Sequence, residues 1–201
     1  MLMVGLSGSQ VGSYWHDGYV IVEDLLPPWA CKVLQDHALP RLSFDVCGGR
    51  VSGLQTTWYY GPPGGSGFNL HQDNHLVKAI KDGFASVWIA MQDVTEEMGA
   101  LVGYPGSQSE DILPQEEVNL PNLAQDPNGT RYAVIPPEKY TSKILTMKQG
   151  SALFMHSHFI HGSGPNTTDR WRQALLMTYI RQGGDFRPGE RAKREPVDVY
   201  T

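Results

Sequence analysis

The sequence predicts a mainly β (α+β) fold, a jelly-roll-like double sheet of short strands with helices packed outside it. Twenty-two Gly and 14 Pro among 201 residues indicate many turns, which disfavour a helical bundle. Short runs of β-branched and aromatic residues recur along the chain at close spacing. Long polar connections separate some of these runs, which is consistent with a double sheet.

The first part of the chain predicts a strand, a helix and a longer strand. The β-branched run at residues 20–22 indicates the first strand. The helix is expected to begin at the prolines 27–28, which suit a helix start, and to end just before Pro40. Residues 51–60 predict the longer strand, and the Gly/Pro-rich loop 61–69 follows it.

The second part predicts further strands on both sides of a long polar segment. The run 86–94 alternates two sets of apolar side chains: Val87, Ile89 and Met91 on one face, and Trp88 and Ala90 on the other. A short strand follows within 99–108, and the Pro/Asn-rich segment 107–142 is expected to be a lid-like loop excursion. Regular strands then return, at residues 142–147, 151–157, 158–163 and 173–180.

We expect residues 1–201 to form a single domain with its core at about residues 14–182. The tail, residues 183–201, is polar and is expected to be poorly ordered. Its basic side chains are expected to be solvated, with contact to a substrate carboxylate or to a second copy of the chain as the alternatives: Arg187, Arg191, Lys193 and Arg194.

Charge and cysteine content restrict the partners and the compartment. The formal net charge is −5, and no basic run precedes the tail, so nucleic acid is not expected as a partner. No apolar stretch is long enough to span a bilayer, so no membrane partner is expected. Cys31 and Cys47 have neither zinc nor disulfide-framework spacing, which favours a reducing, cytoplasmic location. The sequence does not indicate an oligomeric state.

His71 and Asp73 form the strongest chemical signal in the chain. Residues i and i+2 of an extended segment project to the same face, so both side chains can reach one metal ion. A histidine from a distant strand would complete the two-histidine, one-carboxylate face that is typical of non-heme Fe(II) oxygenases. His161 is one candidate, and strand parity does not separate it from His156 and His158.

An arginine near the distal histidine would suit a carboxylate co-substrate. Arg172 directly precedes the predicted strand 173–180, so its planar, charged fork could point into the barrel and grip a carboxylate. Arg170 competes with it, but it follows Asp169 in a turn-like stretch and is interpreted as solvated. The residues thus indicate iron and a carboxylate co-substrate.

Three blocks occur in a characteristic order: HQDNHL at 71–76, VWIAMQDVTEEMGALVGYPGSQ at 87–108, and HGSGPNTTDRWR at 161–172. Together they resemble the phytanoyl-CoA dioxygenase (PhyH-like) family of Fe(II)/2-oxoglutarate-dependent oxygenases. The resemblance covers about residues 14–182 and implies a double-stranded β-helix, a jelly-roll or cupin-like core with flanking helices. One departure is Gln108, where many members carry a histidine.

The resemblance also implies the roles of particular residues. The implied iron ligands are His71, Asp73 and His161, and this match is what favours His161 over the two neighbouring histidines. The implied 2-oxoglutarate contacts are Arg172, Ser163 and Trp88, with Gln55 as a weaker candidate. Candidate substrate contacts are Tyr59, Asn74, Arg131 and Tyr132.

The implied activity consumes O2 and decarboxylates 2-oxoglutarate to succinate while a small-molecule substrate is hydroxylated, desaturated or cyclised. Halogenating relatives lack the carboxylate ligand, so the presence of Asp73 disfavours halogenation. A biosynthetic intermediate is one expected kind of substrate. The alternative function is a cupin-like metal-binding or sensor protein without turnover.

Overall fold

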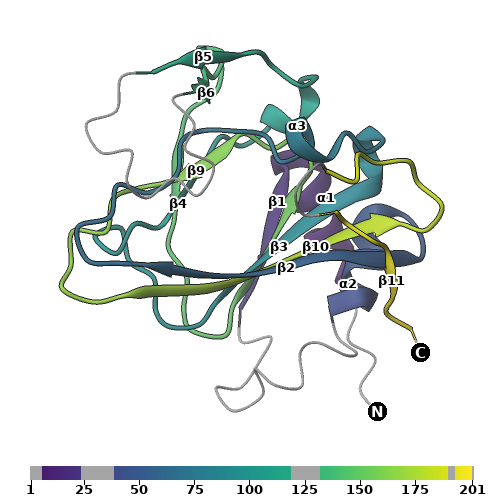
Figure 1. The fold of residues 1–201 in the computed structure, drawn as a ribbon, viewed down its shortest axis with the longest axis horizontal. Coiled ribbons are helices and arrows are strands. Elements are labelled where there is room, and N and C mark those ends of the chain that lie inside the picture. Colours follow the sequence, from purple (N-terminus) through teal and green to yellow (C-terminus); the bar gives the residue numbers. More distant parts are fainter. Residues whose placement is uncertain (1–5, 24–38, 119–131, 190–192, 201) are drawn as a thin grey trace.

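The computed structural model describes residues 6–23, 39–118, 132–189 and 193–200 (Figure 1). Within these residues the strands form three sheets of six, three and two strands, and every pairing is antiparallel. Two of these sheets pack face to face, with helices on the outer side of the larger one. The predicted mainly β, double-sheet architecture is therefore confirmed.

The largest sheet has the order β1-β8-β3-β10-β2-β11. Its strands are β1 (Tyr19–Val22), β8 (Ala152–His156), β3 (Phe84–Ala90), β10 (Arg172–Arg181), β2 (Val51–Gly61) and β11 (Val197–Asp198). The long strands β2 and β10 run beside each other from the Arg172–Gly61 pair to the Arg181–Val51 pair, with one irregularity after Thr178. This is the longest strand pair in the described residues.

The smaller sheets and the helices complete the fold. The three-stranded sheet has the order β7 (Lys143–Leu145), β4 (Leu101–Gly103) and β9 (His161–Ser163), and the two-stranded sheet pairs β5 (Gln115–Glu117) with β6 (Tyr132–Val134). The α-helices are α1 (Gly8–Asp17), α2 (Leu39–Cys47) and α3 (Asn74–Val77). Short 3-10 helices are η2 (Lys81–Gly83) and η3 (Ser107–Ser109).

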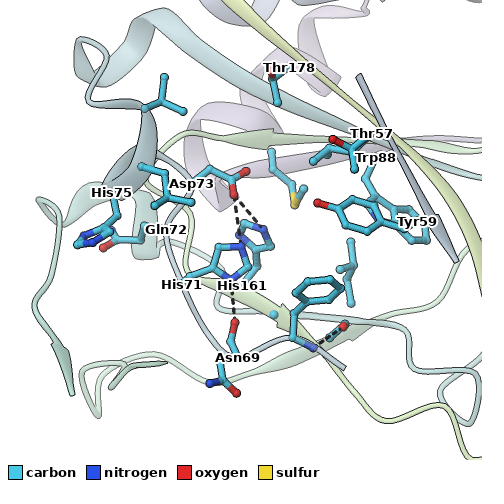
Figure 2. A pocket seen from close by; sticks show the side chains of 18 of the residues that line it. Thr57, Tyr59, Asn69, His71, Gln72, Asp73, His75, Trp88, His161 and Thr178 are labelled. Atoms are coloured by element: carbon cyan, nitrogen blue, oxygen red, sulfur yellow. Dashed lines mark hydrogen bonds and ion pairs between the residues drawn. The ribbon is translucent and has the colours of Figure 1, made fainter. Parts of the chain in front are cut away.

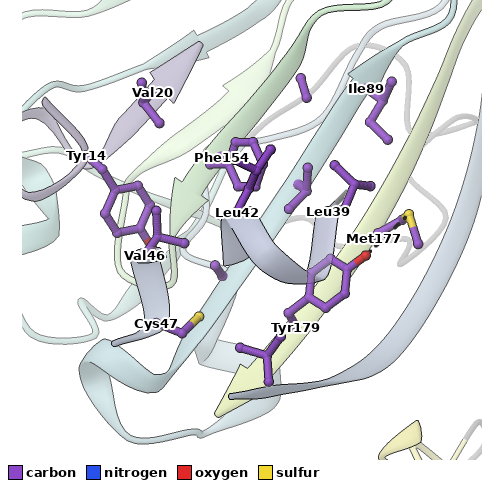
Figure 3. Close-up of a cluster of buried hydrophobic side chains, with 14 of the residues drawn as sticks. Tyr14, Val20, Leu39, Leu42, Val46, Cys47, Ile89, Phe154, Met177 and Tyr179 are labelled. Atoms are coloured by element: carbon purple, nitrogen blue, oxygen red, sulfur yellow. Dashed lines mark hydrogen bonds between the residues drawn. The ribbon is translucent and has the colours of Figure 1, made fainter. Parts of the chain in front are cut away.

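Apolar clusters lie on both faces of the six-stranded sheet. On the outer face, Tyr14 of α1 and Leu42 of α2 pack against Phe154 and other strand residues (Figure 3). On the inner face, Leu153 packs with residues of the three-stranded sheet such as Leu101. Because adjacent residues of one strand point to opposite faces, β8 supplies both clusters.

The alternation expected around β3 is confirmed. The set Val87, Ile89 and Met91 packs in the outer cluster, while Trp88 and Ala90 belong to the inner one. Every residue of β3 is buried, since the sheet is covered on both sides at this strand. The inner face is therefore the one that can line a cavity between the sheets.

Two helices differ from the predictions. The N-terminal helix α1 was not predicted, although Ser7 and Gln10 form a capping box that marks its start. Pro40, expected to follow the end of a helix, lies instead within α2 as the structure describes it, Leu39–Cys47. The predicted helix itself falls at residues 27–38, outside the described residues.

The two irregular regions carry more structure than expected. Within 107–142, the described residues contain η3 and the β5–β6 pair rather than loop alone, and residues 119–131 lie outside the description. The prediction that the tail is poorly ordered is wrong for its last residues. There β11 pairs with β2, and the Val51 amide donates to the Tyr200 hydroxyl oxygen at 3.1 Å. The tail thus adds an edge strand to the main sheet.

Within the described part of the chain, no helix combines the length and apolar character needed to cross a membrane.

Candidate functional site

The two candidate ligand histidines are brought together by the backbone. His71 and His161 form an isolated antiparallel bridge, in which each amide donates to the other's carbonyl at 2.8 and 3.0 Å. Their rings lie side by side with centroids 4.4 Å apart (Figure 2). One pair of hydrogen bonds at the start of β9 therefore joins two residues that lie 90 positions apart in the sequence.

In each of the two rings, a nearby backbone carbonyl oxygen determines which nitrogen carries the proton. Nδ1 of His71 lies 2.7 Å from the Asn69 carbonyl oxygen, and Nδ1 of His161 lies 3.0 Å from that of Phe159. A carbonyl oxygen only accepts, so Nδ1 carries the proton in each ring and Nε2 is left with its lone pair. Both Nε2 atoms face Oδ1 of Asp73, at 3.3 Å from His71 and 3.8 Å from His161.

This geometry fits a metal cation. Two imidazole lone pairs and one carboxylate oxygen converge, and their ligand atoms all lie within 4.8 Å of one another. Three acceptors repel each other unless a cation lies among them, and this donor set is the face used by non-heme Fe(II) sites. The hydrogen bonds at the two Nδ1 atoms are the outer contacts that usually orient metal-bound histidines.

Asp73 stands just before α3, and the Ser86 hydroxyl of β3 donates to its second oxygen, Oδ2. Burial alone raises the pKa of the Asp73 carboxyl, but the two histidines and the Ser86 hydroxyl outweigh it and hold this pKa well below its usual range. Burial, and then the neighbouring His71, lowers the pKa of His161. At neutral pH the site thus offers an ionised carboxylate and a neutral His161, as a divalent cation requires.

The residues between and beside the ligands anchor the segment to the fold. The buried Gln72 amide donates to the carbonyl oxygens of His158 and Asp111 at 2.8 and 3.2 Å, and its oxygen accepts from Leu113 N at 2.8 Å. Asn74 is also buried, and its amide nitrogen lies 2.9 Å from the Ala79 carbonyl oxygen. Asn74, a predicted substrate contact, is not among the residues that line the pocket described below.

The other two candidate histidines are committed elsewhere. Nε2 of His156 lies 3.0 Å from Asp82, and its Nδ1 accepts from the His158 amide at 3.0 Å. Nε2 of His158 lies 3.0 Å from the Asn74 amide nitrogen, and its Nδ1 lies 2.9 Å from the Glu110 carbonyl oxygen. Neither histidine joins the cluster of possible metal ligands found in the described residues.

The metal-type cluster opens into a pocket of about 610 Å³ between the sheets (Figure 2). The residues that line it come from β2, β3, β4, β8, β9, β10, α3, the β5–β6 pair, the segment 68–73 and the C-terminal segment. They include the predicted residues Gln55, Tyr59, Trp88, Tyr132, Ser163 and Arg172. Arg131 lies outside the described residues.

Arg172 is a buried cation in the wall of this pocket. It is 5% exposed, one guanidinium nitrogen donates to the Gly99 carbonyl oxygen, and its Nε has no hydrogen-bond partner. None of the ion pairs in the described residues involves it. Burial lowers the pKa of Arg172, yet an arginine stays charged at neutral pH. A buried charge of this kind calls for an anion, which a ligand carboxylate would supply.

The remaining predicted residues lie at different depths of the pocket. Ser163 accepts from the Phe68 amide at 2.9 Å, beside the Arg172 end. Burial, and then the charge of Asp73, raises the pKa of Tyr59 to about 12, so its hydroxyl remains a hydrogen-bond donor. Gln55 lies far from the Arg172 end, because its strand partner is Thr178.

Three residues that the sequence analysis did not name also line this pocket: Thr57, Gln115 and Thr178. His75 lines it too, as does Arg194, for which contact with a substrate carboxylate was the alternative to a solvated position. Thr57 could have been found from its position two residues from Tyr59, on the same face of β2. The sequence could not decide between the alternatives for Arg194, because its position depends on the path of the tail.

An antiparallel double sheet that aims two histidines and a carboxylate into a pocket with a buried arginine defines the class of non-heme, 2-oxoglutarate-type oxygenase folds. The family model described as phytanoyl-CoA dioxygenase (PhyH) matches residues 32–174. The chain belongs to the phytanoyl-CoA dioxygenase family.

Curated relatives agree with this assignment. The chain is 30% identical over 112 residues to a probable phytanoyl-CoA dioxygenase of Caenorhabditis elegans, a match that covers 55% of this chain and 35% of that protein. It is 30% identical over 108 residues to the peroxisomal phytanoyl-CoA dioxygenase of Homo sapiens, covering 53% and 31%. A probable alpha-ketoglutarate-dependent hypophosphite dioxygenase of Stutzerimonas stutzeri is 28% identical over 120 residues, covering 59% and 41%. The matches thus span about a third of the first two relatives.

Solved structures share the fold. The carbocyclase SnoK from nogalamycin biosynthesis, described as non-heme and alpha ketoglutarate dependent, superposes with a TM-score of 0.70 at 17% identity, covering 96% of this chain and 93% of that one. The epimerase SnoN, in complex with Fe3+, alpha ketoglutarate and nogalamycin RO, gives 0.69 at 15% identity, with 94% of each chain covered. At these identities the similarity is one of fold, and it confirms the predicted jelly roll.

Proposed function

We propose that this protein is an Fe(II)- and 2-oxoglutarate-dependent dioxygenase that hydroxylates, desaturates or cyclises a small molecule. One observation carries the proposal. The convergent ligand atoms of His71, Asp73 and His161 open into the same pocket as the buried, unpaired cation of Arg172. A metal-holding protein has no need of the second feature. Membership of the phytanoyl-CoA dioxygenase family supports the same activity.

In this proposal each residue has a defined task. His71, Asp73 and His161 hold the iron, and Arg172 binds the far carboxylate of 2-oxoglutarate, with Ser163 beside it. When bound, the iron supplies the activation of O2 that links decarboxylation of 2-oxoglutarate to succinate with oxidation of the substrate.

The pocket walls would orient the co-substrate and keep water out. Trp88, Leu101 and Leu176 line the pocket with apolar surface, and Trp88 is only 5% exposed. Such a wall strengthens the attraction between Arg172 and a carboxylate, because fewer water molecules compete for either charge. Tyr59 and Tyr132 are the predicted substrate contacts that also line the pocket.

The test is an anaerobic titration of the purified protein with Fe(II) and then 2-oxoglutarate. The chelate has a visible metal-to-ligand charge-transfer band, and we expect the wild type to develop it. In Arg172→Gln the affinity for 2-oxoglutarate should fall on the order of 100-fold, because a buried carboxylate loses its partner. Stoichiometric iron binding without the band would favour a metal-binding or sensor protein without turnover.

The wider context is also proposed. The chain would act as a single oxygenase domain on a small molecule, such as a biosynthetic intermediate. We propose a cytoplasmic location, supported by the buried free thiol of Cys47, which is usual in reducing compartments. Fractionation of cells that produce the protein would test this, and recovery from another compartment would overturn it.

A further inference from the structure

A second arginine reaches the pocket from the C-terminal segment. The backbone amide of Arg194 donates to the Pro188 carbonyl oxygen at 2.8 Å, and its half-buried side chain lines the pocket. Its Nε lies 3.4 Å from the Gln55 side-chain oxygen, and its Nη1 lies 3.2 Å from the Arg187 carbonyl oxygen. The guanidinium is thus held in place by two neutral acceptors.

Arg194 and Arg172 lie toward opposite ends of the pocket. Arg172 pairs with Gly61 at the start of the β2–β10 ladder, whereas Gln55, which contacts Arg194, pairs with Thr178. Six residues along a strand correspond to roughly 20 Å. This separation is between backbone positions of the strands, and both arginine side chains line the same pocket, so each arginine can pair with an anionic group of its own.

The cluster of His71, Asp73 and His161 lies beside the same part of the β2–β10 strand pair as Arg194. Ser86 pairs with Thr178 across β3 and β10, and its hydroxyl holds Asp73. Gln55 pairs with Thr178 from the other side, so Asp73 and Arg194 border the same row of residues. A co-substrate that extends from the metal toward Arg172 therefore leaves the space beside Arg194 for a different molecule.

In the described part of the chain, no carboxylate of the pocket lining forms an ion pair with Arg194. Among the described residues that line the pocket, the one carboxylate is Asp73, which faces the two histidines. None of the ion pairs in the described residues involves Arg194, and no hydrogen bond there uses its Nη2. A guanidinium has five N–H donors, so it can accept an anion without losing its present contacts.

The surroundings of Arg194 narrow the ligand class further. Partial burial, and then the like charge of Arg187, lower the pKa of Arg194, and the charge of Asp73 opposes these two effects only in part. A bound anion would offset both of them. The same end of the pocket is lined by the apolar side chains of Leu76, Val77 and Phe84. A ligand for this end therefore needs an anionic group attached to a small apolar body.

We propose that Arg194 is a specificity-determining residue that binds a carboxylate or phosphate group of the oxidised substrate. The substrate would place this group at the Arg194 end of the pocket and an adjacent carbon beside the metal ligands, while Arg172 holds the co-substrate. The inference rests on the proposed function for the identity of the co-substrate, but the anion site itself can be tested without turnover.

The test compares probes that differ in charge alone or in the kind of anion. Phenylacetate, phenyl phosphate and the neutral phenylacetamide are titrated by ligand-observed NMR into protein loaded with Mn(II) and saturating 2-oxoglutarate. The wild type should bind at least one anion about tenfold more tightly than the amide, as expected for a charge-assisted hydrogen bond. The stronger of the two anions then distinguishes a carboxylate substrate from a phosphate substrate.

Three substitutions complete the design. Arg194→Gln should abolish the preference for the anion, and Arg194→Lys should retain part of it. Lys193→Gln removes the same charge from the neighbouring, exposed position and should change nothing. Thermal melting confirms that each variant is folded. An anion preference that persists in Arg194→Gln, or a wild type without any preference, would overturn the proposal.

A second series separates this inference from the proposed function. The titrations are repeated in Arg172→Gln without metal or 2-oxoglutarate, so that no anion can bind the deep arginine. An Arg194-dependent preference in this background supports the substrate site even if the protein shows no charge-transfer band. A charge-transfer band together with no Arg194-dependent preference would keep the oxygenase and reject the site.

Discussion

Side-chain hydrogen bonds and backbone hydrogen bonds share the task of aiming the three candidate ligands. The tautomers of His71 and His161 are set by carbonyl groups two residues before each ring, which side-chain substitutions do not remove. Asp73 depends on a side chain, because the Ser86 hydroxyl fixes its second oxygen. Ser86 is therefore the residue outside the ligand set whose loss should weaken the metal site most directly.

We predict that Ser86→Ala lowers the affinity for Fe(II) by about tenfold, the lower end of the effect of losing an outer contact to a ligand. The loss arises because the Asp73 carboxylate becomes freer to rotate and less stabilised in its ionised form. Anaerobic iron titration measures it. Ser151→Ala is a matched control, since Ser151 is also fully buried but its hydroxyl has no partner in the structure. Equal affinities in the two variants would contradict the role of Ser86.

The histidines outside the ligand set predict a pH dependence of stability. Burial, only partly opposed by Asp82, lowers the pKa of His156 from its ordinary 6.5. Near pH 6 the unfolded chain therefore binds more protons than the folded chain. The protonation of His156 should leave the free energy of unfolding unchanged above about pH 7 and should lower it as the pH falls toward 5. Denaturant unfolding at several pH values measures this slope. In His156→Gln the slope should be smaller, and an unchanged slope would assign the effect to other groups.

At the scale of elements, the contact between β9 and the segment before His71 decides whether the site assembles. Gly162 lies in β9 between the paired residue His161 and Ser163, and a Cβ there would meet the Phe68 carbonyl oxygen at 2.6 Å and the Asn69 backbone at 3.1 Å. The Asn69 carbonyl also holds the His71 ring. A larger residue at 162 would therefore separate the two histidines.

We predict that Gly162→Ala destabilises the fold by about 1–3 kcal/mol, a common effect of overpacking, and weakens Fe(II) binding as well. Gly164→Ala is the matched control, because its Cβ would have no neighbour nearer than 3.8 Å. Chemical denaturation and iron titration of both variants measure the two effects. Normal iron affinity in Gly162→Ala would show that the segment can move without disturbing the site.

The elements show why some positions were predictable and others were not. The alternation around β3 follows from the strand period, and the residues themselves display it. Asn74 was a predicted substrate contact; in the structure α3 begins at this residue, and its side chain contacts Ala79 and His158. A change from extended to helical backbone reverses the face, and no pattern in the sequence marks that change.

At the scale of the whole molecule, the C-terminal segment adds an edge strand to the largest sheet. The β11 strand pairs with β2, and Arg50 and Asp198 form an ion pair of 3.8 Å near that edge. This pairing holds the C-terminal segment beside β2, and Arg194 of that segment lines the pocket. Substrate recognition is thereby joined to a segment that contributes no candidate metal ligand and no co-substrate contact.

We predict that deletion of residues 193–201 leaves the iron–2-oxoglutarate charge-transfer band in place and removes the preference for anionic probes. The melting temperature should fall, because the edge strand and the hydrogen bond to Tyr200 are lost. Parallel titrations of the truncated and full-length chains measure both properties. Loss of the band would mean that the segment supports the deep part of the pocket as well.

The whole-molecule comparison also shows how far the sequence could lead. The fold class followed from composition and strand patterns, and motif context selected His161 from three neighbouring histidines that parity left equivalent. Arg194 could not be assigned in this way, because its position depends on a strand pairing between residues more than 140 positions apart. Solvated and pocket-lining arginines are identical in a sequence until the partner strand is known.

The β2–β10 ladder keeps an unbroken register from Gly61–Arg172 to Gln55–Thr178, and its irregularity comes only after Thr178. Arg172 and Gln55, the residue that Arg194 contacts, are therefore separated by a fixed number of strand residues. One inserted residue would turn the side chains beyond it to the opposite face. We expect relatives that keep this register but differ in the tail to bind the same co-substrate and to accept substrates of different length or charge.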